Sequence, residues 1–141
     1  MRPTYETTAD RQKEQSFAKR LEQRGYTMHQ CKKYYDCDFF AIRGCYKALV
    51  EYRNRKVRRN TYPDIMLSAA KFAHLRNAAN QLGVRFLFFI EFVDGLCAID
   101  LTEYTGFRVD IGGSNRRNDP QDIEPCVYIP TNHLQILENR G

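Results

Sequence analysis

The sequence lacks any apolar run that could cross a bilayer and any apolar segment at its start typical of a secretion signal. Its longest apolar stretch, from Phe86 to Ile90, is far shorter than the about 20 residues of a membrane-spanning helix. It also lacks a CxxC pair, and its 5 cysteines are odd in number, which argues against a disulfide framework. We therefore expect a soluble, intracellular (cytoplasmic) protein with no membrane association and no organic cofactor.

The sequence does not support a zinc-binding site either. His29, Cys31 and Cys37 offer three ligand types at loose spacing, but no fourth partner is near in the sequence and the spacing matches no common closed site. Small core or strand residues are the simpler interpretation of the cysteines.

Length and charge are more informative. A chain of 141 residues suits one domain, residues 1–141, because two separate cores of half that size would each be marginal. The formal charge of +5 is unevenly divided: residues 1–84 hold 17 Lys and Arg against 8 Asp and Glu, whereas residues 85–141 hold 5 against 9. The first part is therefore the expected contact surface for a polyanion.

Hydrophobic periodicity predicts an α/β fold with a mixed central β-sheet flanked by helices. A first helix, with Phe17, Ala18 and Leu21 at helical spacing, ends at Gly25. The segment Arg85–Val93 is continuously apolar apart from single charges and predicts a central strand. The remaining expected elements are strands at Tyr26–Gln30, Asp36–Ile42, Tyr46–Arg53, Leu96–Asp100 and Val127–Ile129, and a second helix near Ile65–Leu82.

Several charged residues stand where simple burial would not place them. Asp36 and Asp38 should face the same side of one strand, and pairing with the next strand can bring Asp38 near Glu51. Lys71 lies on the apolar stripe of the second helix and Glu14 on that of the first, so both should point inward. Two or three carboxylates with retained waters are a usual site for Mg²⁺, which can activate an attacking water.

These residues resemble a known pattern. Asp38, 12 intervening residues of hairpin and then Glu51-Tyr52-Arg53 are similar to the PD-(D/E)XK nuclease superfamily over about residues 9–100, with 101–141 as an extension. The resemblance implies a restriction-endonuclease-like core in α-β-β-β-α-β order and Mg²⁺- or Mn²⁺-dependent hydrolysis of DNA, with RNA as the alternative substrate. It also implies metal binding by Asp38 and Glu51.

In the Holliday-junction resolvases and the helicase-nuclease group of this superfamily, an acid on the first helix joins the metal site and a polar residue on the second helix assists. Glu14 and Lys71 correspond to these residues. The C-terminal segment Gly112–Pro130 is similar to the tails of small phage-encoded nucleases. Many relatives are dimers, so a homodimer is also expected.

The chain departs from the motif at Arg53, which replaces its lysine and is a poor proton carrier, although it can bind phosphate. Lys71 is the candidate replacement. This departure keeps open a catalytically inactive nucleic-acid-binding module with the same fold. A structural or assembly protein is a third class, and it would show no salt-dependent affinity for nucleic acid.

A cationic run follows the motif. Because so many charges cannot bury themselves, Asn54–Asn60 should be a solvated loop, and its cations predict phosphate contacts. Among the tyrosines beside it, such as Tyr52 and Tyr62, packing is favoured over base stacking. The predicted nucleic-acid-binding residues are Arg55, Lys56, Arg58, Arg59, Arg116 and Arg117.

Overall fold

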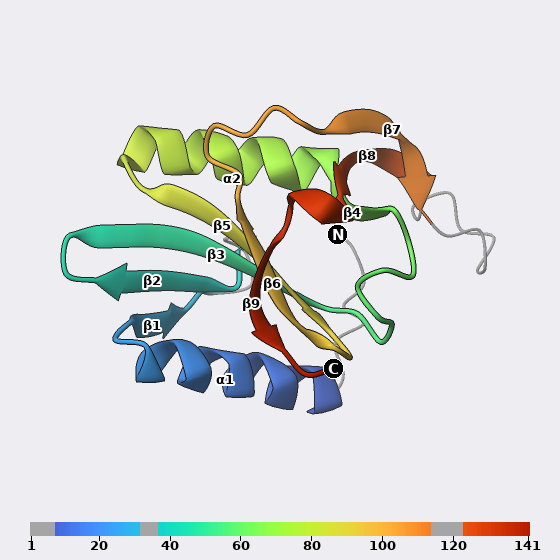
Figure 1. The fold of residues 1–141 in the computed structure, drawn as a ribbon. Coiled ribbons are helices and arrows are strands. Elements are labelled where there is room, and N and C mark those ends of the chain that lie inside the picture. Colours follow the sequence, from blue (N-terminus) through green and yellow to red (C-terminus); the bar gives the residue numbers. More distant parts are fainter. Residues whose placement is uncertain (1–7, 32–36, 114–122) are drawn as a thin grey trace.

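The computed structural model describes residues 8–31, 37–113 and 123–141, and Figure 1 shows its fold. The elements are α1 (Thr8–Gln23), β1 (Thr27–Gln30), β2 (Phe39–Arg43), β3 (Tyr46–Asn54), β4 (Asp64–Ser68), α2 (Ala69–Leu82), β5 (Arg85–Phe92), β6 (Gly95–Asp100), β7 (Arg108–Gly113), β8 (Ile123–Pro130), a 3-10 turn (Thr131–His133) and β9 (Gln135–Asn139).

The larger sheet has six strands in the order β1-β2-β3-β5-β6-β9. Strands β3 and β5 are parallel, and the other neighbours are antiparallel. The parallel pair follows from the chain between β3 and β5, which passes through α2 on one face of the sheet, while tight turns connect the antiparallel pairs β2–β3 and β5–β6. The prediction that the strand near Arg85–Val93 is central is therefore confirmed, and so is a mixed sheet flanked by helices.

The two helices cover opposite faces of this sheet, as Figure 1 shows with α1 below and α2 above. On the α1 side, Phe17 and Leu21 pack with Ala41, Val50 and other buried residues in one cluster. On the α2 side, a second cluster gathers Phe72, Leu75 and Ala79 with Phe86 and Phe88 from β5. Side chains alternate between the two clusters along β3 and β5, as the pleat of a buried strand requires.

A second sheet of three strands, in the order β4-β8-β7, was not predicted. The second helix was expected to begin near Ile65, but this segment is strand β4. In it Ile65 and Leu67 are buried while Met66 between them is half-buried, so the period is 2 rather than 3.6. The helix begins after Ser68, whose side-chain oxygen accepts a hydrogen bond of 3.3 Å from the backbone N–H of Lys71.

The C-terminal residues join both sheets. Strand β8 extends well beyond the expected Val127–Ile129 and pairs with β4 and β7, while β9, which was not predicted, forms an edge of the larger sheet beside β6. Strand β2, next to the opposite edge strand β1, begins at Phe39 rather than at Asp36. No helix among the described residues is long and apolar enough to span a membrane.

Candidate active site

The β2–β3 hairpin aligns Asp38 with Glu51. Its register pairs Phe39 with Val50, so the next position outward on β2 lies opposite Glu51. Two hydrogen bonds fix Asp38 there: its N–H donates to the Val50 carbonyl at 3.0 Å, and its Oδ2 accepts from the Tyr52 N–H at 2.7 Å. Asp38 thus stands immediately before the strand, not inside it, and Asp36 lies outside the described residues.

Glu51 is only 2 % exposed, which is unusual for a carboxylate. On the α2 side of the sheet its Oε2 lies 2.9 Å from Lys71 Nζ and 3.9 Å from Arg53 Nη2. Burial, and then the neighbouring charge of Asp38, raises its pKa from 4.5 to about 7, against the opposing effect of the two cations. The structure therefore brings together Asp38, Glu51, Lys71 and Arg53, as the sequence suggested.

The other oxygen of Glu51 provides a test of whether these residues fit a metal. Glu51 Oε1 is buried and has no hydrogen-bond partner among the described residues, a costly state for a carboxylate oxygen. Within the same part of the chain no group of three or more His, Cys, Asp or Glu side chains is arranged for a metal. Mg²⁺, however, is commonly held by one or two carboxylates plus waters and substrate phosphates. Two carboxylates, one of them with an oxygen that makes no hydrogen bond, fit such a site.

Glu14 takes a different position. It is half-buried on α1. Burial and the hydrogen bond to Glu91 raise the pKa of the Tyr52 hydroxyl, and the charge of Glu14 adds to this effect. Tyr52 stacks on Phe17 of α1, with ring centroids 4.4 Å apart, and so lies on the opposite face of β3 from the Glu51–Lys71 pair. The structure thus places Glu14 across the sheet from Lys71.

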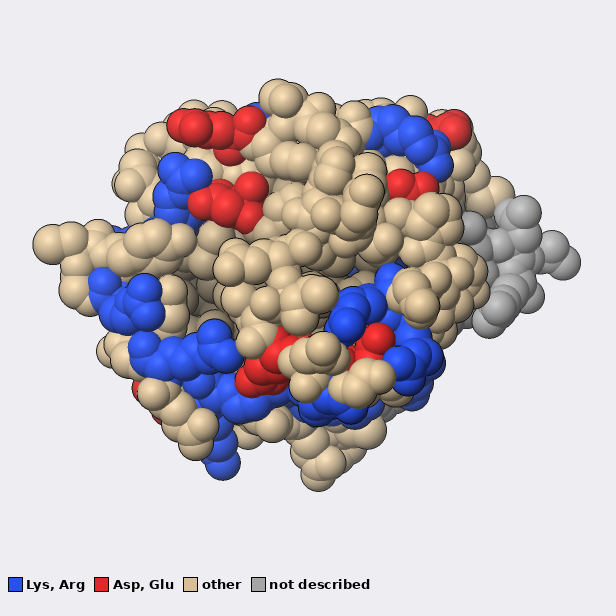
Figure 2. Space-filling view, in the orientation of Figure 1, with Lys and Arg blue, Asp and Glu red and all other residues tan. Residues whose placement is uncertain are grey.

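The cationic run after β3 is only partly free to meet a ligand, which corrects the expectation of a fully solvated loop. Asp94, 4 % exposed, lies 3.8 Å from the guanidinium groups of both Arg58 and Arg59. Arg58 also donates to the carbonyl of Gly141 at 2.7 Å. Arg55 is half-buried and Lys56 is exposed. Arg116 and Arg117 lie outside the described residues. Figure 2 shows Lys and Arg gathered on the lower part of one face, with acidic side chains between them.

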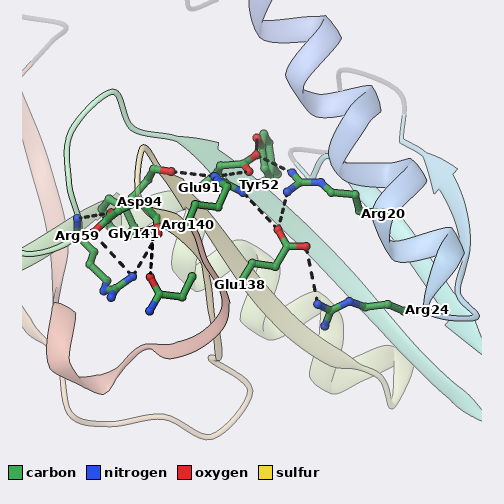
Figure 3. A network of polar contacts seen from close by, with 11 residues as sticks. Arg20, Arg24, Tyr52, Arg59, Glu91, Asp94, Glu138, Arg140 and Gly141 are labelled. Atoms are coloured by element: carbon green, nitrogen blue, oxygen red, sulfur yellow. Dashed lines mark hydrogen bonds and ion pairs between the residues drawn. The ribbon is translucent and has the colours of Figure 1, made fainter.

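A second polar network, on the α1 side, was not foreseen from the sequence (Figure 3). Glu91 Oε1 accepts from Arg20 at 2.7 Å and from the Tyr52 hydroxyl at 2.5 Å, and its Oε2 accepts from Arg140 at 2.9 Å. Arg20 also donates to Glu138 at 2.7 Å. Because these partners lie 39 to 118 positions apart, no local sequence pattern predicts them. The network ties α1 and the C-terminal strand to β5.

Two cysteines flank the candidate site. Cys31 and Cys37 place their sulfur atoms 3.1 Å apart, and the Cys31 N–H donates to the Asp38 carbonyl at 3.0 Å. Burial raises the pKa of both thiols. His29 is exposed on β1, and no three-ligand cluster with these cysteines occurs among the described residues.

Comparison with known proteins assigns the chain to a family. A model of the family described as "Phage putative PDDEXK endonuclease" matches residues 1–137. The chain belongs to this family. Membership in this endonuclease family supports a nuclease function. A search of curated proteins found no match.

The fold is shared with other PD-(D/E)XK proteins. One similar solved structure is that of Hjc, a Holliday junction resolvase from the archaeal hyperthermophile Archaeoglobus fulgidus, with a TM-score of 0.62 and 14 % sequence identity over 87 % of this chain and 84 % of that one. The fold of this family member is thus restriction-endonuclease-like, with strand β4 inserted between the third core strand and the second helix.

Proposed function

We propose that the chain is a Mg²⁺- or Mn²⁺-dependent nuclease that hydrolyses phosphodiester bonds of DNA. The observation that carries the proposal is the buried Oε1 of Glu51, which has no hydrogen-bond partner among the described residues and lies beside Asp38. The chain also belongs to an endonuclease family. Asp38 and Glu51 would hold the metal ion. When bound, such an ion lowers the pKa of water and neutralises charge on the phosphate.

The cations around these acids have distinct roles in the proposal. Lys71 Nζ lies 2.9 Å from Glu51 Oε2 and so can orient a water at the acids and stabilise charge developing on the phosphate. Arg53, with its planar guanidinium 3.9 Å from the same oxygen, suits phosphate binding better than proton transfer. Lys71 therefore takes the place of the motif lysine.

Glu14 remains a proposed supporting acid. Because it lies across the sheet from Lys71, we expect Glu14→Gln to reduce cleavage far less than substitution of Asp38 or Glu51. A homodimer, which would place two such sites on one substrate, is likewise proposed and is tested by sedimentation of the full chain.

The deciding experiment is cleavage of labelled single-stranded, duplex and branched DNA, and of RNA, with Mg²⁺ or Mn²⁺. Asp38→Asn and Glu51→Gln should each lower the rate at least about a hundredfold, whereas Glu103→Gln, at an exposed position, should leave it unchanged. Lys71→Ala should also impair cleavage, and Lys71→Arg should restore little.

The second candidate function is a nucleic-acid-binding module without chemistry, which Arg53 at the position of the motif lysine favours. It predicts no cleavage of any substrate with either metal while salt-sensitive binding persists. That result would replace the nuclease proposal.

A further inference from the structure

A cavity of about 500 Å³ opens beside the end of β3, between the loop that follows this strand and strands β4 and β8. Its volume lies within the range of small-molecule sites in proteins. Arg55 and Lys56 stand on its rim. Arg55 lies four positions after Glu51, a reach of about 13 Å at 3.3 Å per residue. The cavity is therefore adjacent to the candidate active site without being part of it.

The rim carries a cation that lacks an acidic partner. Arg55 is half-buried, and its pKa is lowered by burial and then by the charge of Arg53. No carboxylate among the described residues contacts its guanidinium. By contrast, Arg58 and Arg59 on the same loop are both engaged by Asp94. A half-buried guanidinium beside another cation is stabilised by an anion, and phosphate matches its planar donor geometry.

The walls of the cavity are largely apolar and aromatic. Val57, Met66 and Phe92 line it, together with Tyr62, a residue that is 62 % exposed. An aromatic ring left this open is free to stack on a planar ligand.

The opposite rim offers no comparable group. Tyr128 is already covered by the guanidinium of Arg108, 4.3 Å from the ring centroid. Arg108 also lies 3.5 Å from Asp64, the acid of the cavity lining. The open aromatic and the unpartnered cation thus both belong to the loop after β3.

We propose that this cavity holds an unpaired nucleotide of the nucleic-acid substrate, with its base against Tyr62 and its phosphate on Arg55 and Lys56. A nucleotide joins a planar ring with apolar faces to an anionic phosphate. The ring complements the apolar walls of the cavity, and the phosphate complements its cationic rim. The inference rests on the proposed function, since it places the nucleotide next to the phosphodiester to be cut. It favours single-stranded or branched substrates, because a base within a duplex must first leave the stack.

The test compares two labelled DNA strands of 12 nucleotides. One strand consists of thymidines, and the other has the same phosphate backbone but is abasic at every position. Binding is followed by fluorescence anisotropy with the full-length protein in EDTA, so that no strand is cut. The thymidine strand should bind at least about fivefold more tightly, the lower limit for one stacked base. Equal affinities would overturn the proposal.

Matched variants assign the two contacts. Tyr62→Ala should abolish the preference for the thymidine strand and Tyr62→Phe should retain it, while Tyr46→Ala, at another exposed tyrosine, should have no effect. Arg55→Ala should weaken both strands equally and reduce the salt dependence by about one phosphate contact. A Tyr62→Ala variant with the full preference would refute the stacking contact.

A measurement without substitutions guards against misfolded variants. A strand carrying one 5-iodouracil is photocrosslinked to the native protein, and the modified peptide should contain Tyr62. Crosslinks confined to other tyrosines would overturn the proposal. It would also be overturned if an apolar peptide bound in the cavity and the thymidine strand did not displace it. The outcome is separable from the nuclease proposal: preferential binding without cleavage refutes only the latter, and cleavage without preference refutes only the cavity.

Discussion

Replacing Glu51 by Gln should stabilise the metal-free protein at alkaline pH while it removes cleavage. Glu51 is buried with a pKa raised from 4.5 to about 7. Between these pH values the unfolded chain has released the proton and the folded chain retains it, so stability falls as pH rises through this window. A pKa difference of about 2.5 corresponds to about 3 kcal/mol. Gln resembles the protonated carboxyl and does not titrate.

The stability difference between variant and native protein should therefore be small at pH 4.5 and grow to about 3 kcal/mol in favour of Glu51→Gln at pH 8. Urea unfolding of both proteins in EDTA at a series of pH values measures it. Because all other titrating groups are shared, the difference isolates Glu51. Glu103→Gln, at an exposed site, is the matched control and should show no such trend.

Metal should reduce this difference. A divalent ion that binds only the folded native protein at ten times its Kd adds about 1.4 kcal/mol. Glu51→Gln should lose this gain, so its advantage at pH 8 should fall to about half. The reasoning is refuted if Glu51→Gln is the less stable protein at pH 8 in EDTA, or if the difference does not change with pH.

Three further predictions concern the surrounding structure. Glu91→Ala should lower the free energy of unfolding by about 3 kcal/mol, because it leaves partly buried Arg20 without that partner; urea denaturation checks this, and a loss below about 1 kcal/mol contradicts it. Phe17→Ala, at a fully buried ring, should cost about 4 kcal/mol in the same assay, unlike exposed Tyr46→Ala. Exposed Cys45 should react with a disulfide reagent at pH 8 well before buried Cys37, whose thiol pKa is raised; equal rates would argue against this burial.

The sequence was informative where the relevant contacts are local. Asp38 and Glu51 belong to one hairpin, and the turn at Gly44, with φ +61°, together with strand alternation determines which residues face each other. The stripe on the second helix likewise directed Lys71 toward the sheet. The acids and the lysine could therefore be grouped before their coordinates were known, although their roles remain predictions.

Contacts between distant segments could not be predicted in this way. Strand β4 is a short apolar segment that fits helix and strand equally, and only its pairing with β8 decides between them. The partners of Glu91 are distributed over α1, β3 and the C-terminus. Asp94 likewise forms ion pairs with Arg58 and Arg59 from 35 or more positions away. The loop that was expected to be solvated is therefore partly held in place by these ion pairs.

The start of α2 has a consequence for how the protein folds. The acids Asp38 and Glu51 are joined by a hairpin with short-range contacts, which forms early at low entropic cost. Lys71 follows Ser68, and β4, which carries Ser68, is held by β8, about 60 positions later in the chain. Closing so long a loop is slow. During synthesis the two acids should thus come together first, and the lysine should reach its final position only after the C-terminal strands have emerged.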